Sequence, residues 1–261
     1  MRNFLRWTMA VALTAIWMSS VVRADDWAAI LGAAQAQCDE QQAAIHDITV
    51  VEEMVAHTPD GEMAATQTLY RKGEKSRMEM VVHKNVMGME NMQTIVINSG
   101  DKAWMFNSFT GKTEMDPEDA DQASDFQDCW GFTPENSKVV GSGEAQGRDC
   151  WIVDMVRDSV QHKLWLDKER LFVIQGESHD EEAGIRWALS DFRKINGKFD
   201  YPHKIEMFDG DEPVSTMTVT SVKINDGLAD DLFDPEKVEM KTVDMEELMK
   251  QMMQEAEPDT Q

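Results

Sequence analysis

Cysteine is scarce in this chain of 261 residues, with only three copies, and none of them has the Cys-x-x-Cys spacing. That absence argues against thiol–disulfide exchange and against a structural zinc site. In an exported protein, three cysteines are expected to form one disulfide and leave one thiol over. Three pairings of Cys38, Cys129 and Cys150 are possible. We favour Cys129–Cys150, which would tie a long acidic loop to the strand that follows it.

Catalytic and metal-binding motifs are also lacking. The six histidines are scattered, and none lies in a Gly-x-Ser-x-Gly or His-Glu-x-x-His context. The acidic stretches "SHDEEAG" and "DGLADDLFD" lack the glycine and spacing of a calcium-binding loop. We therefore predict a protein that is not an enzyme and that needs neither a metal ion nor another cofactor.

Basic residues are few: 25 Lys and Arg stand against 49 Asp and Glu, for a formal net charge of -24. An acidic surface of this size repels nucleic acid and anionic lipid headgroups. We expect no nucleic-acid partner. We interpret the charge as a solubility device for a protein that carries exposed apolar surface.

Only one long apolar run is present, "WTMAVALTAIWMSSVV", at residues 7–22. Arg2 and Arg6 precede it, and "VRA", ending at Ala24, offers small residues at the usual cleavage positions. This pattern predicts a secretory signal peptide over residues 1–24, with a core too short for a stable membrane span. No small-residue-plus-cysteine box lies beside it, so we expect a soluble, exported protein without a lipid anchor.

Residues 25–45 have helical periodicity, with one apolar stripe made of Trp27, Ile30, Leu31, Ala34, Cys38 and Ile45. The period then changes to two, which is typical of strands. Strand-like alternation covers residues 47–57, 62–72, 74–82, 92–98, 102–107, 137–146, 148–156, 162–167, 171–179, 184–195, 203–209 and 213–225.

Two further segments depart from the strand pattern. Residues 116–136 form an acidic insertion, helical or irregular, with Phe126, Trp130 and Phe132 embedded in it. Residues 243–261 predict a Met-rich amphipathic helix followed by a tail. That helix could serve as a lid or a partner-docking element, or it could pack against the outside of the sheet.

The order of elements predicts one domain, residues 25–242, that is mainly β with flanking helices. We expect an unclosed antiparallel β-barrel, or curved sheet, of about a dozen strands with a helical lid. A loose helical cover over a concave apolar face would leave an open-mouthed cavity, a recurrent site for apolar ligands. The alternative is a packed core without a cavity, because ordinary sandwiches show the same alternation.

Four stretches, in order, carry a resemblance to a known family. They are "TLYRKGEKSRMEM", "VINSGDKAWMFNSFTGK", "HKLWLDKERLFVIQGESHDEEAG" and "VKINDGLADDLFDPEKVEM". Together with the signal peptide, this order resembles the LolA-like superfamily of periplasmic lipoprotein carriers. The resemblance implies an unclosed barrel with a helical lid over a hydrophobic cavity that takes acyl chains.

The resemblance also implies a function and partners. By analogy, the protein would be a non-enzymatic periplasmic carrier that moves acylated lipoproteins or lipids toward the outer membrane, as a monomer, between membrane-bound donor and acceptor proteins. Arg77 looks like the family's functional arginine, which would bond lid groups and control opening. The alternative for Arg77 is a solvent-facing residue paired with a neighbouring acid. The alternative for the whole protein is a lipid-responsive regulatory module of envelope stress.

Alternating positions on the strands supply candidate residues for the cavity wall, since alternate side chains share a face. They are Met78, Met80, Val82, Trp104, Phe106, Trp151, Val153, Met155, Leu164, Leu166, Ile205 and Met207.

The stretch "MEMVVHKNVMGMENM" has two interpretations. Met87, Met89 and Met92 could line the cavity rim, where flexible side chains suit the entry of an acyl chain. Met87 and Met89 could instead converge with His83 on Cu(I), which prefers thioether and imidazole ligands. Because methionine is frequent throughout the chain, we favour the rim over the copper site.

Overall fold

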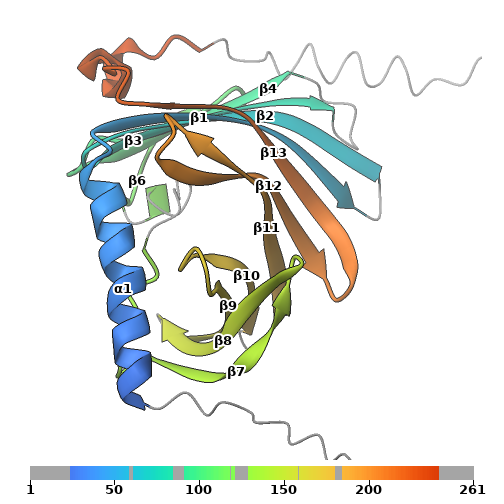
Figure 1. The fold of residues 1–261 in the computed structure, drawn as a ribbon. Helices are drawn as coiled ribbons and strands as arrows, with labels where there is room; N and C mark the ends of the chain where they lie inside the picture. The colour runs from blue at the N-terminus through green and yellow to red at the C-terminus, as the bar shows by residue number, and fades with distance from the viewer. Residues whose placement is uncertain are drawn as a thin grey trace, which may run out of the picture.

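The protein is described by a computed structural model over residues 24–58, 61–84, 91–117, 119–120, 129–157, 159–179 and 184–240. Within these ranges the main elements are one antiparallel sheet, one long α-helix and two short 3-10 helices (Figure 1). The helices are α1 (Ala24–Ala43), η1 (Asp230–Phe233) and η2 (Pro235–Lys237). The first seven strands are β1 (Asp47–Thr58), β2 (Gly61–Lys72), β3 (Lys75–Lys84), β4 (Met92–Asn98), β5 (Ala103–Asn107), β6 (Gly111–Met115) and β7 (Ser137–Ala145). The other six are β8 (Arg148–Arg157), β9 (Val160–Asp167), β10 (Val173–His179), β11 (Gly184–Ile195), β12 (Phe199–Asp209) and β13 (Glu212–Ile224).

The expectation of a mainly β fold with a curved, unclosed sheet is confirmed. Twelve strands lie at the predicted segments, and β6 is an additional one that has little apolar content to mark it. Residues 1–23 of the predicted signal peptide (1–24) and the predicted helix at residues 243–261 lie outside the described residues, and Ala24 is the first residue of α1.

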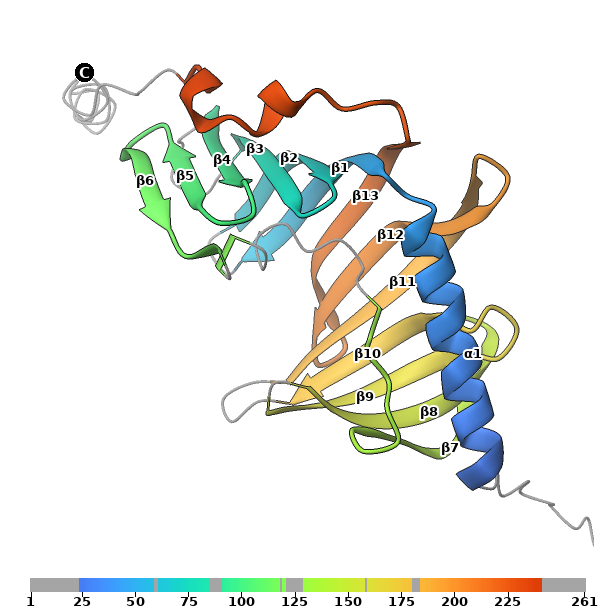
Figure 2. The same ribbon diagram turned by 90° about the vertical axis from the view of Figure 1, so that its left-hand side faces the viewer.

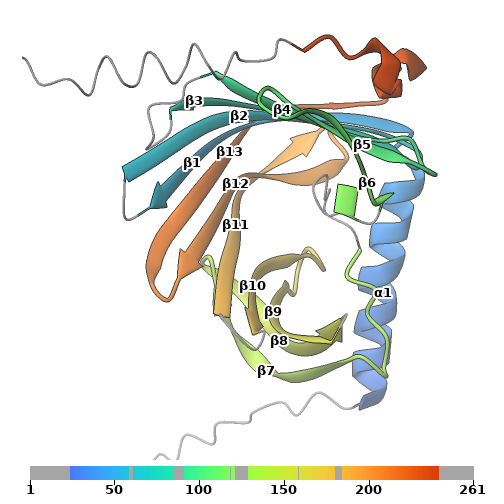
Figure 3. The same ribbon diagram turned by 180° about the vertical axis from the view of Figure 1, so that it is seen from behind.

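The sheet is built from two meanders joined by a single long-range pairing. Its strand order is β6-β5-β4-β3-β2-β1-β13-β12-β11-β10-β9-β8-β7. All neighbours but one are consecutive in sequence; the exception is β1 with β13, whose register places Ile48 opposite Ile224. The outermost strands, β6 and β7, are not paired with each other in the described part of the chain, so the sheet curves around without closing (Figures 1 and 3).

Register shifts help to bend the sheet. One lies between Val51 and Glu52 where β1 meets β13, and another between Met207 and Phe208 where β12 meets β13. A β-bulge adds a residue to one strand and increases local bending and twist. These irregularities lie in the central strands, where the sheet turns from its upper to its lower half (Figure 1).

Helix α1 spans the open side of the curved sheet (Figures 1 and 2). Its predicted apolar stripe is confirmed: Trp27, Leu31 and Ala34 are buried in one cluster with Leu164 and Leu166 of β9. The helix is therefore a cover that packs its first half directly onto the sheet.

The carboxyl end of α1 is bonded to the end of β13. The side chain of Asn225 accepts a hydrogen bond from the backbone N–H of His46 at 2.7 Å and donates one to the carbonyl of Ala44 at 2.9 Å. The buried Asp47 carboxylate accepts hydrogen bonds from the backbone N–H groups of Asp226 and Gly227. These contacts hold the helix end at the β1–β13 seam.

A disulfide links α1 to the segment between β6 and β7. It joins Cys38 to Cys129, with the two Cα atoms 5.8 Å apart. The expected Cys129–Cys150 bond is therefore wrong. Cys150 is a buried free thiol that packs with Ala145 and Ile174. It alternates along β8 with Trp151, which packs on the α1 side, so the sheet separates its thiol from Cys129.

The convex face has its own apolar cover. Phe233 of η1 is buried against Ile95, Ile97 and Phe106, and the segment that holds η1 and η2 runs along the outside of the upper strands (Figures 2 and 3). The C-terminal segment thus covers the convex face of the first meander, whereas α1 packs on the concave face of the second. No helix in the described ranges is both long and apolar enough to cross a membrane.

Removal of the disulfide tests its part in holding α1. The bond closes a stretch of 91 residues, and a cross-link of that length constrains the unfolded chain. We expect Cys38→Ser with Cys129→Ser to lower the free energy of unfolding by about 2–4 kcal/mol. Urea denaturation of the oxidised protein and of the double variant measures this. Cys150→Ala, which keeps the disulfide and buries no hydroxyl, is the control for loss of a cysteine outside the bond. Equal stability of the double variant and wild type would contradict the expectation.

Candidate ligand-binding cavity

A cavity of about 370 Å³ lies between the second half of α1 and the concave face of the sheet. This volume is at the lower end of the range typical of small-molecule sites, roughly 300–1,000 Å³. The helix contributes Ala34, Gln35, Cys38, Gln41 and Gln42 to the wall, followed by Ile45. The β-sheet and its connections contribute Ile48, Arg71, Arg157, Leu166, Leu171, Phe172, Val173, Trp187, Leu189, Phe199, Asp200, Tyr201, Ile205 and Ile224, and the segment before β7 adds Cys129, Trp130 and Phe132.

Strand alternation places the apolar side chains on this wall. Ile205 of β12 is opposite Leu189 of β11 in the register, and both point to the concave side. Ile48 and Ile224 are likewise opposite each other at the β1–β13 seam. The wall therefore runs continuously across the centre of the sheet.

An aromatic stack borders one part of the cavity. Trp130 and Trp187 have nearly parallel rings, with centroids 5.7 Å apart and planes inclined by 9°. Trp187 lies over Gly176 of β10, its partner in the register. Sequence patterns did not identify this pair, because Trp130 lies in an insertion and only the tertiary fold brings it to β11.

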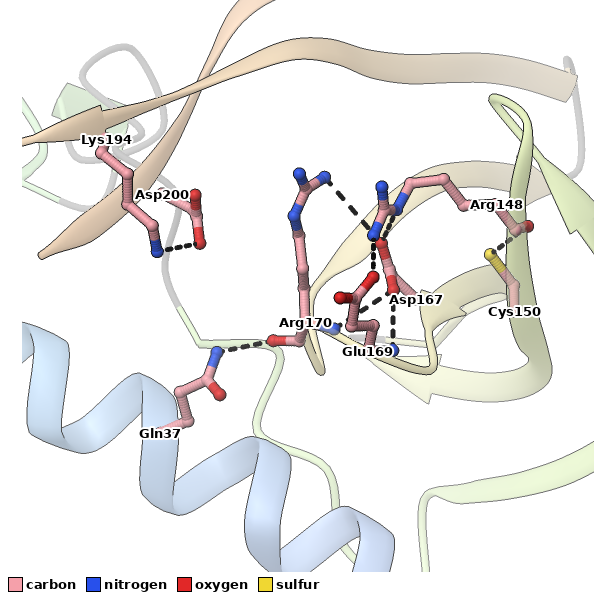
Figure 4. Close-up of polar contacts among 8 residues, drawn as sticks. All are labelled: Gln37, Arg148, Cys150, Asp167, Glu169, Arg170, Lys194 and Asp200. Atoms are coloured by element: carbon pink, nitrogen blue, oxygen red, sulfur yellow. Dashed lines mark hydrogen bonds and ion pairs between the residues drawn. The ribbon is translucent and has the colours of Figure 1, made fainter.

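Polar groups occur at separate points of the wall. The pKa of the Tyr201 hydroxyl is raised above its usual value, mainly by burial and then by the charge of Glu52. The charge of Arg71 acts in the opposite direction and lowers this pKa. Asp200 is paired with Lys194, with Nζ and Oδ2 2.6 Å apart (Figure 4). Gln35, Gln41 and Gln42 of α1 also line the cavity, and the amide of Gln35 donates a hydrogen bond to Asp39 at 2.9 Å.

The turn between β9 and β10 holds α1 against the sheet. Gln37 of α1 donates a hydrogen bond to the carbonyl of Arg170 at 2.7 Å (Figure 4). Asp167 anchors this turn: its carboxylate accepts the backbone N–H groups of Glu169 and Arg170 and is paired with Arg148. Burial opposes its ionisation, but the hydrogen bond from Arg148 and those from the backbone outweigh burial and lower the pKa of Asp167. The turn is thus hydrogen-bonded within itself and to the helix.

The predicted cavity residues are divided between the cavity wall and the packed core. Leu166 and Ile205 line the cavity. Val153, Met155 and Leu164 are buried in the cluster under the first half of α1, with Trp151 partly buried against it. In the first meander, Met78 is buried with Met80 against it, and Val82 is also buried. Met207 is half-buried on β12 opposite Trp187. Their role in ligand binding stays a prediction.

The prediction that Trp104 and Phe106 line the concave cavity needs correction. Both lie on the convex face, where they pack with Phe233 of the C-terminal segment. On β5, it is Met105, between them, that joins the cluster on the concave side. Their alternation was predicted correctly, but it does not reveal which of two covered faces a side chain occupies.

Arg77 also lies on the convex side. It donates a hydrogen bond to the carbonyl of Leu232 at 2.8 Å and is paired with Glu79 at 2.6 Å. Its contacts therefore fasten the C-terminal segment, whereas α1 lies across the other face. Control of lid opening by Arg77 stays a prediction.

The methionine run is only partly described. Met92 is half-buried at the start of β4, whereas Met87 and Met89 lie outside the described residues. His83 is exposed, and its Nε2 lies 2.7 Å from the hydroxyl of Thr66. Among the described residues, no group of three or more His, Cys, Asp or Glu could hold a metal ion.

Substitution of Gly176 tests how closely the ring of Trp187 packs on β10. A Cβ at this position would lie 2.4 Å from Cζ2 of Trp187, so the ring must move. We expect Gly176→Ala to lower the free energy of unfolding by about 1–3 kcal/mol through overpacking. Gly141→Ala is the matched control, because no atom lies within 4 Å of its added Cβ. Similar urea midpoints for the two variants would show that Trp187 is not fixed there.

Glu52 offers a test of interior polarity. This carboxyl is buried on β1, and burial raises its pKa to about 6. The folded state then holds the proton more tightly than the unfolded state, so stability is lost as pH rises from about 4.3 to about 6. We expect Glu52→Gln to raise the free energy of unfolding by about 2 kcal/mol at pH 7.5 and to leave it nearly unchanged at pH 4.

Denaturation curves at the two pH values measure the effect of Glu52→Gln. Glu53→Gln, at the next and exposed position, serves as the control and should change stability by less than about 0.5 kcal/mol. If Glu52→Gln raised the free energy of unfolding by the same amount at both pH values, burial of the charge would not be the cause of that increase.

No family model and no curated protein matches this sequence. Solved structures do match. An outer membrane lipoprotein-sorting protein domain from Vibrio parahaemolyticus superposes with a TM-score of 0.56 at 12% identity, covering 79% of this chain and 98% of that one. A DUF1329 family protein from Desulfovibrio piger superposes with a TM-score of 0.61 at 13% identity, covering 81% and 99%. At such identities the likeness concerns the fold: this chain shares the curved, unclosed antiparallel sheet of these two structures, which is the fold that the sequence resemblance implied.

Proposed function

We propose that this protein is a non-enzymatic periplasmic carrier that binds an acyl chain of a lipid or lipoprotein between α1 and the sheet. The observation that carries the proposal is the apolar cavity under a helix that spans the open side of the sheet. Transport toward the outer membrane, by way of membrane-bound donor and acceptor proteins, is part of the same proposal. It is supported by the shared fold with a domain described as lipoprotein-sorting.

The energetics favour an acyl chain as ligand. Transfer of an acyl chain from water into an apolar site yields about 0.8 kcal/mol per methylene, so a dozen carbons supply substantial affinity without any polar anchor. A volume of about 370 Å³ is small for this class of site and favours one chain over several. The ligand therefore replaces water along the wall formed by Leu189, Ile205 and Ile224.

The attachment of α1 determines how the acyl chain of the ligand enters the cavity. The helix is fixed at its carboxyl end by Asn225, at Cys38 by the disulfide, and at Gln37 by the β9–β10 turn. Three fixed points in the second half of the helix restrict its movement next to the cavity. We propose that entry uses small displacements of the side chains at the mouth, with α1 retained on the sheet.

Binding of a fluorescent fatty acid tests the proposal directly. We expect the purified protein to bind the probe and unlabelled fatty acids to displace it. Ile205→Trp fills part of the cavity with a larger side chain. It should weaken probe binding at least about tenfold, since the acyl chain of the probe then lacks space. Ile185→Trp is the matched control, because Ile185 is 45% exposed and does not line the cavity.

Mass spectrometry of organic extracts from the native protein complements the probe. Acyl lipids that co-purify with wild type and are depleted from Ile205→Trp would support the proposal. Native protein that is consistently empty, together with no probe binding by wild type, would reject it. Thermal unfolding of both variants confirms that each is folded.

A further inference from the structure

The cavity wall has a charge opposite in sign to that of the protein. Among the described residues, the charged side chains that line it are Arg71, Arg157 and Asp200. Asp200 is already paired with Lys194. Two arginines and one aspartate give the wall a formal charge of +1, although acids outnumber basic residues by 49 to 25 in the whole chain. Composition alone would predict the reverse.

The two arginines differ in their surroundings. Arg157 is exposed at the end of β8, where water and salt screen its charge. Arg71 is half-buried on β2, opposite Ile48, and its charge acts on the hydroxyl of the half-buried Tyr201. A cation in such a partly dry environment interacts more strongly with an anion than one in water does.

Strand order places Arg71 at one end of the apolar wall. From β2 the wall continues through Ile48 on β1, Ile224 on β13 and Ile205 on β12 to Leu189 on β11. A ligand whose head lies at Arg71 can therefore extend its chain across the central strands.

We propose that Arg71 and Tyr201 bind the head of the ligand, and that the ligand is a single-chain amphiphile with an anionic head, a carboxylate or a phosphate. This inference rests on the proposed function and specifies its ligand class. A guanidinium presents a planar fork of N–H donors that matches carboxylate and phosphate oxygens, and a tyrosine hydroxyl adds one donor. Arg71 already interacts within the protein, but five N–H donors allow it to bind an anion as well.

Glu52 limits where the head can lie. Its carboxyl is buried near Tyr201 but does not line the cavity, so an anionic head on the cavity side avoids direct contact with it. The acidic exterior repels anionic headgroups at a membrane surface. The cationic wall thus provides selective attraction only inside the cavity.

The test compares a fatty acid with its methyl ester, which has the same chain and a neutral head. At pH 7.5, wild type should bind the acid about tenfold more tightly than the ester. Arg71→Gln should bring the two affinities within about twofold of each other by weakening only the acid, and Arg71→Lys should keep part of the preference. Arg193→Gln is the matched control: Arg193 is exposed, paired with Asp191 and outside the cavity wall, so the preference should stay.

The outcomes separate this inference from the function on which it rests. If wild type binds neither acid nor ester, the proposed function fails. If it binds both equally, or if folded Arg71→Gln keeps the preference, the head assignment fails while the carrier function stands. If Arg157→Gln, and not Arg71→Gln, removed the preference for the acid over the ester, the head would lie at Arg157 at the end of β8. The assignment to Arg71 would then fail. Displacement of the fatty acid by inorganic phosphate alone would show a site for free anions and overturn the assignment to an amphiphile.

Discussion

The pairing of β1 with β13 is the constraint on which the rest of the molecule depends. It joins two meanders, each made of neighbouring hairpins, into one sheet of thirteen strands. Nine residue pairs, from Ile48↔Ile224 to Ala56↔Ser215, form this seam. Without it, the first and last strands would both be free edges, and the chain would form two smaller sheets. Because the end of α1 is bonded to Asn225 just after β13, the same seam also sets where the helix crosses the open side.

The sheet is covered on both faces, but the two covers differ. On the convex face, η1 and the residues after it pack closely over the first meander, and Arg77 adds a hydrogen bond and an ion pair. On the concave face, α1 packs tightly only along its first half, around Trp27 and Leu31. Its second half stands off from the strands and leaves the cavity. The cavity is thus a consequence of one straight helix that crosses a curved sheet.

Charge is distributed to match this division. The acidic exterior repels anionic surfaces, whereas the charged side chains of the cavity wall, in the described residues, are two arginines and one aspartate. Burial has a cost for every polar group in this interior, as the raised pKa of Glu52 shows. A polar side chain at the cavity wall therefore needs a physical explanation. For Arg71 and Tyr201, the proposed explanation is that they bind the head of the ligand.

Local pattern by itself determined the helix at the start of the described chain, twelve of the thirteen strands and the class of fold, because periodicity and turn residues depend on near neighbours. Local pattern also determined which side chains share a face, since alternation is a property of one strand. Only the tertiary structure decided which face is which: Trp104 and Phe106 lie on the convex side because the C-terminal segment returns to cover them. It also decided that Cys38 pairs with Cys129, and that Trp130, Trp187, Arg71 and Tyr201 border one cavity. Those contacts join residues far apart in sequence, and they form only after the β1–β13 pairing has positioned both meanders and the helix.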